Sequence, residues 1–368
     1  MVAFSDLRFD YRIFREAFSL VEAGHKITVF CTAFDKQPVE GWEDINIHLL
    51  QIDRSQSLRI LYPLFWRWAF KHLKSINADV FHAHDLDTLL PCAWAAKRCN
   101  KPLIYDSHEF WTEQSSLVNR PLIRTFWTRL ENHLIPKVHR IITVSQAIAH
   151  SLNQKYPDAP YATVLRNLPL YRSFEKSNRI RNKLNISPES PIVLYQGGFL
   201  FDNGLREQIK AAKGFGNAVF VLIGSGPCEK ELKSLVAKEG LQEKVFFIDR
   251  VPFSELHSYT CSADLGLCLI KNSGRSFYHS LPNKLFEYMM GGLPVIGSNF
   301  PEIENIIKRT GVGTTLDPSD IDSIALEVRN VLKNQSNLSK KHLSAISASK
   351  IYNWEKESDV LIKLYSEL

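Results

Sequence analysis

Short apolar runs rich in β-branched residues alternate with longer amphipathic segments along the whole chain. Amphipathic segments such as residues 11–23, closed by Gly24, have the spacing of helices with one buried face. Such alternation predicts an α/β protein with doubly wound parallel sheets and helices on both faces. The predicted strands are residues 2–4, 27–31, 45–50, 80–84, 103–106, 141–144, 163–165, 192–196, 219–224, 245–248, 265–269, 294–297 and 313–316.

A polar, charged segment at residues 170–190 interrupts the alternation of strands and helices and is typical of a linker. The chain of 368 residues is long enough for two domains, each with its own core. We expect two Rossmann-like domains, residues 1–170 and 171–350, facing across a cleft, with a helix at 351–368 packing back towards the first. Ligands of such sheets bind beyond the carboxyl ends of the strands. The first predicted strand is short, which leaves open whether the natural chain begins earlier.

Composition favours a soluble globular protein, with 45% hydrophobic and 23% charged residues. There is no apolar run of the roughly 18 residues that a membrane span needs, and no signal-peptide pattern at the start. The six cysteines form no CxxC pair, as expected for free thiols in a reducing compartment. These features predict a cytoplasmic location.

The net charge of +6 is modest, but two segments concentrate basic and aromatic residues at helical spacing, 58–74 and 119–140. An anionic membrane surface suits such segments, which would make the protein peripheral on the inner face of the membrane. Two ordinary amphipathic helices covering a sheet are the alternative. A nucleic-acid partner is not expected, because no recognised binding motif accompanies the charge.

The stretch "HSLPNKLFEYMMGGLPVIGS" predicts a helix that starts at Pro282 and ends at a double glycine. Its wheel places Lys284, Glu287 and Tyr288 on one arc, opposite an apolar face. A cation in the first turn opposes the helix dipole unless an anion is bound there, and free N–H groups with a lysine suit a phosphate. The alternative is a solvated Lys284 paired with Glu287.

Two strand ends carry histidine and carboxylate residues. "VFHAHDLD" contains His82, His84 and Asp87, which are reasonable metal ligands, although lining a ligand cleft is the favoured role. "LIYDSHEFW" contains His108 between carboxylates, and a neutral imidazole there can hydrogen-bond a hydroxyl-rich substrate. No Ser-His-Asp or Cys-His nucleophile set is evident. "VLIGSGPCEKEL" fails the dinucleotide pattern, because Glu229 stands where the third glycine belongs.

Several fragments in the same order resemble a retaining glycosyltransferase of family 4, which has the GT-B fold. In the second half they are "VLYQGGF", "VLIGSGP", "ADLGLCL", "SLPNKLFEYMMGGLPVI" and "NWEKESDVLIKLYSEL". In the first half they are "DLRFDYRIFREAFSLVEAGHKITVF", "HAHDLDTLL", "YDSHEFWTE" and "IITVSQAIAHSLNQKY". The resemblance implies a hexosyltransferase-like enzyme of class EC 2.4, of the kind used in polysaccharide biosynthesis.

The implied reaction moves a sugar from a nucleotide diphosphate sugar to a glycan, lipid-linked or small-molecule acceptor, with no metal and no cofactor. The roles implied as catalytic are those of His108, Lys284 and Glu287. The donor residues are Gly197, Gly198, Arg250, Val251, His279, Asn283, Lys284 and Glu287, and the acceptor residues are Arg8, His84, Asp85, Asp106 and Glu109. Glu287 is expected to hold the ribose hydroxyls, and Lys284 the diphosphate.

Three positions depart from the family pattern. His279 stands at the first glutamate of its E-x7-E arrangement, and Pro282 stands where a glycine is common. The usual Arg and Lys after the first C-terminal strand are absent, and "QGGFLFDNG" offers Gly198 and Asn203 instead. Two alternatives stay open at this point. One is a catalytically silent GT-B paralogue that binds a sugar nucleotide or a partner, and the other is a metal-dependent hydrolase.

Overall fold

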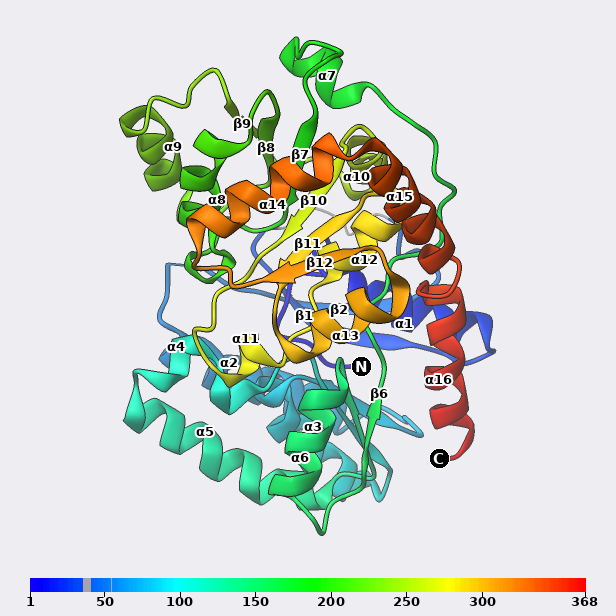
Figure 1. Cartoon of the computed structure of the whole chain (residues 1–368). Coiled ribbons are helices and arrows are strands. Elements are labelled where there is room, and N and C mark those ends of the chain that lie inside the picture. The colour runs from blue at the N-terminus through cyan, green and yellow to red at the C-terminus, as the bar shows by residue number, and fades with distance from the viewer. Residues whose placement is uncertain (36–40, 54) are drawn as a thin grey trace. The chain divides into compact units, whose positions relative to one another are not determined.

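The computed structural model describes residues 1–35, 41–53 and 55–368. The chain forms two compact units, each described here by itself (Figure 1). Unit 1 comprises Met1–Asn167, Gly274–Ser276 and Glu357–Leu368, and unit 2 comprises Leu168–Ser273 and Phe277–Lys356. The first boundary lies close to the expected one at residue 170, and most of the C-terminal helix belongs to unit 1. Within the described ranges, no helix is both long and apolar enough to cross a membrane.

Unit 1 is built on parallel strands. A pair in the order β1-β2 and a sheet in the order β3-β4-β5-β6 are linked through Val2, which bridges Phe30 and Ala83. The predicted strand at residues 2–4 is therefore reduced to the single residue Val2, because a polar loop follows at once. The strands are β1 (Thr28–Ala33), β2 (Asn46–Gln51), β3 (Phe81–His84), β4 (Leu103–Ser107), β5 (Arg140–Thr143) and β6 (Ala162–Val164).

Amphipathic helices enclose the unit 1 core. The first begins at a true N-cap, where the Asp10 side chain accepts a hydrogen bond from the Ile13 N–H. The helices are α1 (Tyr11–Glu22), α2 (Leu58–Leu73), α3 (Leu86–Cys99), α4 (Ser115–Val118), α5 (Pro121–Leu134) and α6 (Gln146–Lys155), with short 3-10 turns η1 (Trp111–Glu113) and η2 (Ile135–Lys137). Residues of α11 (Arg275–Tyr278) and α16 (Trp354–Ser366) contribute to both units.

Unit 2 contains one six-stranded parallel sheet in the order β12-β11-β10-β7-β8-β9. Its central strand β7 is buried throughout, and its alternate residues enter two apolar layers, Leu194 in one and Val193 in the other. This is the pattern of a parallel sheet covered on both faces. The strands are β7 (Ile192–Gln196), β8 (Val219–Ile223), β9 (Val245–Ile248), β10 (Leu265–Cys268), β11 (Val295–Ser298) and β12 (Gly313–Leu316).

The segment expected to be a linker is partly folded onto unit 2. It contains α7 (Arg179–Leu184), whose Ile180 is fully buried and whose Arg181 forms an ion pair with Asp264 at 3.0 Å. The polar composition of this segment gave no indication that one apolar residue, Ile180, packs into the core of unit 2. The other elements of unit 2 are η3 (Phe201–Asn203), α8 (Leu205–Ala211), η4 (Ala212–Gly214), α9 (Glu229–Lys238), α10 (Phe253–Thr260), α12 (Asn283–Met290), α13 (Pro301–Thr310), α14 (Ile321–Lys333) and α15 (Gln335–Ser349).

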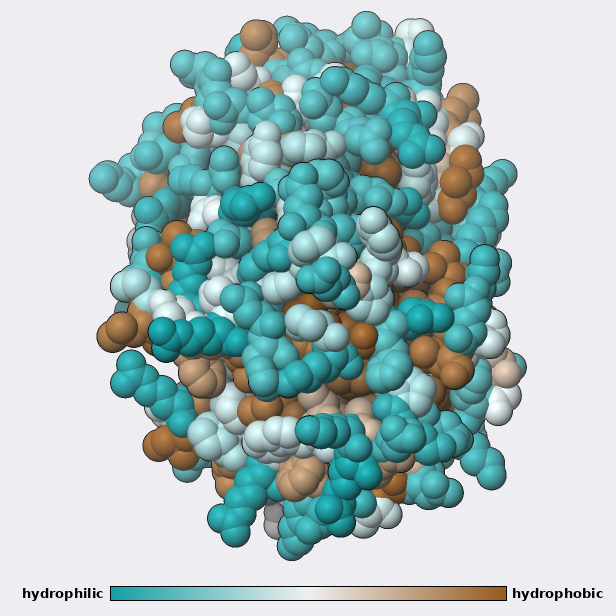
Figure 2. Space-filling model, turned by 90° about the horizontal axis from the view of Figure 1, so that it is seen from below, coloured by the Kyte–Doolittle hydropathy of each residue, from teal (hydrophilic) through white to brown (hydrophobic). Residues whose placement is uncertain are grey.

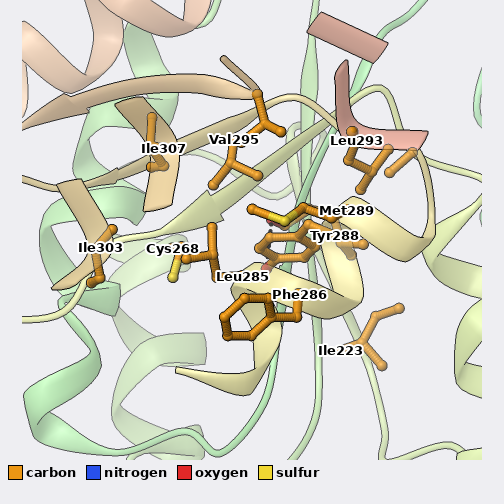
Figure 3. Packing of buried hydrophobic residues seen from close by; sticks show 14 of the residues in the cluster. Ile223, Cys268, Leu285, Phe286, Tyr288, Met289, Leu293, Val295, Ile303 and Ile307 are labelled. Atoms are coloured by element: carbon orange, nitrogen blue, oxygen red, sulfur yellow. Dashed lines mark hydrogen bonds between the residues drawn. The ribbon is translucent and has the colours of Figure 1, made fainter. Parts of the chain in front are cut away.

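Helix α12 packs deeply into the unit 2 core (Figure 3). Tyr288 is fully buried there, so the wheel that placed it on the face of Lys284 was wrong. Gly266 of β10 makes room for the ring, since a Cβ at that position would lie 2.6 Å from it. The Tyr288 hydroxyl lies 3.2 Å from the Leu267 carbonyl oxygen and accepts a hydrogen bond from the Gln196 N–H, which satisfies it inside the core.

Candidate active site

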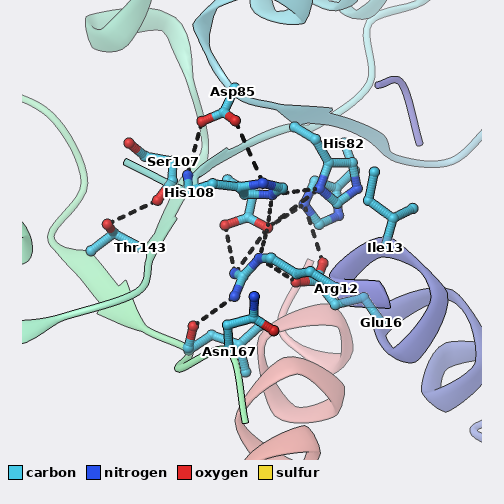
Figure 4. Close-up of polar contacts among 12 residues, drawn as sticks. Arg12, Ile13, Glu16, His82, Asp85, Ser107, His108, Thr143 and Asn167 are labelled. Atoms are coloured by element: carbon cyan, nitrogen blue, oxygen red, sulfur yellow. Dashed lines mark hydrogen bonds and ion pairs between the residues drawn. The ribbon is translucent and has the colours of Figure 1, made fainter. Parts of the chain in front are cut away.

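Polar residues of unit 1 gather where β3 and β4 end (Figure 4). His84 is the last residue of β3 and Asp85 follows it, while Asp106 lies in β4 and His108 follows that strand. Asp85 has a positive φ of 65°, an uncommon conformation for a residue with a side chain. It aims one carboxylate oxygen at the His108 N–H, 2.9 Å away. The turn after β3 therefore fixes the turn after β4.

Arg12 of α1 neutralises the carboxylate at the centre of this group. Its guanidinium donates to both oxygens of Asp106 at 2.8 and 3.0 Å, and to the Leu165 carbonyl oxygen at 3.0 Å. Its Nε also lies 2.9 Å from a Glu16 oxygen. The side chains of Arg12, Asp106 and Glu16 are all buried. These contacts satisfy the Asp106 carboxylate, whereas both Glu16 oxygens are buried without a hydrogen-bond partner among the described residues.

The electrostatics of the group follow from burial and from Arg12. Burial alone would raise the pKa of Asp106, but Arg12 and His108 outweigh it and hold that pKa well below its usual range. The positive charge of Arg12 does not outweigh the burial of Glu16, so burial raises the pKa of Glu16 to about 8. Burial also lowers the pKa of His84 to about 4 and that of His82 well below its usual value. Near neutral pH, Asp106 is therefore ionised and both of these histidines are neutral.

His108 is a cation, not the neutral imidazole that was expected. Burial would lower its pKa, but Asp85 and Asp106 raise it to about 10. Its Nδ1 lies 3.5 Å from an Asp85 oxygen and its Nε2 lies 3.3 Å from an Asp106 oxygen. The ring is partly exposed, with 19% of the side chain accessible. His108 thus presents a fixed positive charge at the end of β4.

The expected acceptor residues divide into two groups. His84 and Asp106 are buried and contact each other and His108, so the structure gives them a supporting position and corrects the expectation that their side chains meet an acceptor. Glu109 is exposed and Asp85 is partly exposed. Arg8 forms ion pairs with Asp6 and Asp35 at the surface. The role of these three in acceptor binding stays a prediction.

Four buried side chains of unit 1, those of Glu16, His82, His84 and Asp106, place potential metal-ligating atoms within 4.8 Å of one another. Asp87, which the sequence grouped with the two histidines, does not belong to this set. His82 Nδ1 already lies 2.7 Å from the Tyr365 hydroxyl. Arg12 already pairs with both carboxylates, so a metal ion would have to compete with a buried guanidinium. The residues therefore fit an internal ion-pair network better than a metal centre.

In unit 2, the loop after β7 is backbone-rich and open. Gly197 and Gly198 are exposed, and Gly197 has a φ of 135°, which favours glycine. The Gly198 carbonyl oxygen accepts hydrogen bonds from the Tyr195 hydroxyl at 2.7 Å and from Asn203 Nδ2 at 2.8 Å. Asn203, which stands where the family has a cation, is thus used to hold this loop.

The glycines after β8 serve the same loop. A Cβ at Gly224 would lie 2.0 Å from the Gly197 oxygen, and one at Gly226 would lie 2.6 Å from the Phe199 oxygen. They are needed for close packing of the two loops. Helix α9 then begins at Glu229, which confirms that these glycines belong to a strand-to-helix turn.

Lys284 reaches the loop after β7 from the first turn of α12. Its Nζ lies 4.1 Å from the centre of the Tyr195 ring, and a Cβ at Gly197 would be 3.5 Å from that nitrogen. Over residues 1–35, 41–53 and 55–368, no carboxylate forms an ion pair with Lys284. The expected alternative, a solvated lysine paired with Glu287, is therefore wrong: the side chain is largely buried and stacks on an aromatic ring.

The start of α12 differs from the prediction by one position. Pro282 is the N-cap residue, with ψ 136°, and the first helical residue is Asn283. No side chain caps this end, so the first N–H groups are left for another acceptor. Asn283 is exposed and His279 is partly exposed just before the helix.

Glu287 is oriented by residues that the sequence analysis missed. Gln196, the last residue of β7, donates from Nε2 to a Glu287 oxygen at 2.6 Å and accepts from the Thr260 hydroxyl at 2.8 Å. The sequence signal that could have revealed this role is a glutamine, Gln196, at the carboxyl end of an otherwise apolar predicted strand. Glu287, Gln196 and Thr260 line one small pocket.

The pocket beside Glu287 also contacts the segment that follows Arg250 and Val251. Its wall includes Phe253 and Leu256 of α10, which begins soon after those two residues. Arg250 is exposed, and Val251 is partly buried against the unit 2 core. The structure thus brings the ends of β7 and β9 and the α12 helix to one side of unit 2.

Two family descriptions match this chain in the order of its units. Glycosyltransferase Family 4 matches residues 12–167, and Glycosyl transferases group 1 matches residues 176–350. The chain belongs to the family 4 glycosyltransferases. It is therefore a glycosyltransferase of the hexosyltransferase class with two Rossmann-like domains, and this excludes the metal hydrolase alternative.

Curated relatives of this glycosyltransferase have names that refer to different compounds. A 2-deoxystreptamine N-acetyl-D-glucosaminyltransferase of Niallia circulans is 22% identical over 283 residues, which cover 73% of this chain and 71% of that protein. A putative colanic acid biosynthesis glycosyl transferase of Escherichia coli, WcaI, is 21% identical over 56% of this chain and 52% of its own length.

Solved structures show the same fold. Sucrose-phosphate synthase of Thermosynechococcus elongatus has a TM-score of 0.78 at 18% identity, covering 97% of this chain and 92% of its own. Anabaena HepE, in a complex with UDP-glucose, has a TM-score of 0.78 at 15% identity, covering 100% of this chain and 98% of its own. These likenesses show the GT-B architecture of this glycosyltransferase.

Replacing Arg12 by leucine tests the buried ion-pair network. The change leaves the Asp106 carboxylate buried without its main partner, so we expect the free energy of unfolding to fall by about 3–5 kcal/mol. Urea unfolding followed by circular dichroism measures the loss. Arg206→Leu is the matched control, because its pairing with Glu231 is at the surface and costs less than about 1 kcal/mol. Equal losses in the two variants would contradict the network.

The charge of His108 predicts a pH dependence of stability. Its pKa is raised from 6.5 to about 10 in the folded state, so the folded chain binds this proton more tightly than the unfolded chain. The contribution is complete below pH 6.5 and is lost as the pH rises towards 10. The difference in unfolding free energy between the native chain and His108→Gln should therefore shrink over this range. A difference that grows with pH would contradict the assignment.

Proposed function

We propose that this glycosyltransferase moves a sugar from a UDP-sugar to an acceptor hydroxyl, retains the anomeric configuration and needs no metal. UDP is chosen because HepE, whose fold this chain shares over its whole length, has complexes with UDP and with UDP-glucose. The donor would bind on unit 2 and the acceptor on unit 1, as the family resemblance implies.

The observation that carries the proposal is the position of Lys284. Its ammonium group lies beside the open Gly197 backbone and at an uncapped helix start, with no carboxylate paired to it among the described residues. A diphosphate is the ligand that such a cation and such N–H groups stabilise best. We assign the leaving diphosphate to this position.

Catalysis in this proposal is mainly electrostatic. Negative charge develops on the diphosphate as the glycosidic bond breaks, and Lys284 and the α12 N–H groups stabilise it. The acceptor hydroxyl attacks from the same face and gives its proton to a diphosphate oxygen. Glu287, held by Gln196, is assigned to the ribose hydroxyls, and cationic His108 is assigned to a hydroxyl of the donor sugar.

The acceptor class is proposed more broadly. Relatives carry names that refer to colanic acid, amylovoran and 2-deoxystreptamine, so a glycan, a lipid-linked sugar and a small molecule are all consistent with the family. A role in polysaccharide biosynthesis is proposed from two of these names. Arg8, Asp85 and Glu109 are the proposed acceptor residues at the surface of unit 1. A peripheral membrane contact is also proposed, and it involves residues of α2, α3 and α5.

Replacing Lys284 by methionine should weaken binding of UDP far more than binding of uridine. The methionine keeps the apolar stem against Tyr195 and removes only the charge, which contributes about 1.5–3 kcal/mol in a charge-assisted contact. We therefore expect the dissociation constant for UDP to rise roughly 10- to 100-fold, and that for uridine to change less than about twofold. Calorimetric titration measures both. Lys308→Met, a change in a surface pair of α13, serves as control. Equal losses for both ligands would remove the diphosphate role.

Replacing His108 by glutamine should lower the rate of transfer and leave UDP affinity nearly unchanged. Glutamine can still donate a hydrogen bond but carries no positive charge. Initial rates with saturating donor, together with UDP titration, separate the two effects. His150→Gln, an exposed change on α6 of the same unit, controls for surface effects. A fully active His108→Gln enzyme would exclude this residue from the reaction.

A catalytically silent protein is the second candidate function. The observation that favours it is the lack of any arginine or lysine in the loop after β7, where the family carries a pair. A panel of radiolabelled nucleotide sugars, tested for turnover with and without added acceptors, distinguishes the two. Binding without either hydrolysis or transfer for every donor would favour the silent protein.

A further inference from the structure

Helix α2 carries a distinctive outer face. Ile60 and Leu64 are 60% and 45% exposed, and Arg67 and Lys71 follow them on the exposed side. The spacing i, i+4, i+7, i+11 places these four residues on one stripe, opposite the buried face. The stripe is thus apolar in its first half and cationic in its second half.

Helix α5 repeats the same order. Leu122 and Phe126 are 87% and 51% exposed, and Arg129 and His133 follow at the same spacing on the exposed side. Large apolar side chains at such exposure are normal when they are scattered. Their recurrence at equivalent positions of two helices, each followed by basic groups, is a pattern that core packing does not require.

Helices α2 and α5 contact each other through aromatic rings, and the α2 rings lie outside its exposed stripe. The rings of Trp66 in α2 and Phe126 in α5 lie 6.4 Å apart, and those of Tyr62 and Trp127 lie 5.2 Å apart. Phe70 of α2 also contacts Trp94 of α3, at 5.4 Å. Trp94 is exposed, and the exposed Lys97 and Arg98 lie on the same side of α3. We call the outer faces of α2, α3 and α5 the outer surface of unit 1.

Among the residues that the structure describes, no carboxylate forms an ion pair with Arg67, Lys71 or Arg129, whereas Arg124 of α5 pairs with Glu113. Helix α2 contains no acidic residue, and the only acids within α3 and α5 are Asp87 and Glu131, both buried. Glu131 is held inside by Tyr156 and Lys155. Figure 2 views the molecule from below the orientation of Figure 1 and shows apolar side chains emerging among hydrophilic ones on that face.

We propose that the outer surface of unit 1 binds an anionic lipid bilayer, with the apolar residues of α2 and α5 entering the headgroup region and the basic residues contacting lipid phosphates. Apolar side chains beside unopposed cations match such an interface, where hydrophobic burial and attraction to anionic lipids add together. The proposal concerns residues separate from the donor site, so it stands or falls independently of the proposed reaction.

A second copy of the chain fits this surface less well. In a two-fold contact the same patch meets itself, so Arg67, Lys71 and Arg129 would approach like charges. A nucleic acid would use the cations but would leave side chains such as Leu122 and Ile60 in water. The lipid surface is the partner that uses both kinds of residue.

Vesicle flotation with the full chain tests the proposal. We expect binding to vesicles of phosphatidylcholine with phosphatidylglycerol, little binding to phosphatidylcholine alone, and release by salt, because screening weakens the contact with anionic headgroups. Leu122→Glu/Phe126→Glu should lower the partition coefficient at least about tenfold, by removing the apolar contribution. Leu343→Glu, a change at a similarly exposed apolar residue of α15, should leave it unchanged. Thermal melting confirms that each variant is folded.

A separate variant tests how much the basic residues contribute to vesicle binding. Arg67→Gln/Lys71→Gln/Arg129→Gln should lower binding to anionic vesicles by roughly tenfold or more, whereas Lys230→Gln/Lys238→Gln/Lys340→Gln in unit 2 should not. Equal binding of folded Leu122→Glu/Phe126→Glu and native protein would overturn the proposal. So would a native chain that floats equally with neutral vesicles, or a concentration-dependent dimer by light scattering that the Leu122→Glu/Phe126→Glu change abolishes.

Discussion

In a parallel sheet all strands end at the same edge, and this constraint positions the polar residues that end or follow β3, β4 and β7. Core strands are apolar because helices cover both faces, so polar side chains concentrate at the point where a strand leaves the sheet. Asp85 and His108 follow β3 and β4 in unit 1, and Gln196 and Gly197 end or follow β7 in unit 2. Asp85 and His108 are neighbours because β3 and β4 pair in the sheet.

The two units treat the charges at this edge in opposite ways. In unit 1 the negative charge of Asp106 is matched inside the protein by Arg12 and His108, so the group holds itself together without a ligand. In unit 2 the charge of Lys284 meets only an aromatic ring and an open glycine loop among the described residues. A buried set of matched charges is suited to fixing geometry, whereas an unmatched cation beside free N–H groups is suited to binding an anion.

Local patterns predicted the strands well and predicted the polar partners poorly. The apolar run at residues 192–196 coincides with β7, because a strand buried on both faces must be apolar along its length. The predictions failed where tertiary contacts decide, as at Tyr288, whose burial depends on the absence of a side chain at Gly266. Arg12 was missed for the same reason, since its partner Asp106 is 94 residues away. Sequence spacing alone contains no signal for such a pair.

The lack of cations after β7 and the presence of Lys284 are linked by sterics. Gly197 has a φ of 135°, so a side chain there would be strained, and its Cβ would lie in van der Waals contact with the Lys284 ammonium group, 3.5 Å away. The Gly198 carbonyl oxygen accepts hydrogen bonds from Tyr195 and Asn203, which hold the loop in place. A loop that carried its own arginine would leave less room for a cation that enters from α12. The proposed diphosphate role thus places one charge on the helix with a bare backbone opposite, where the family resemblance implies two charges in the loop.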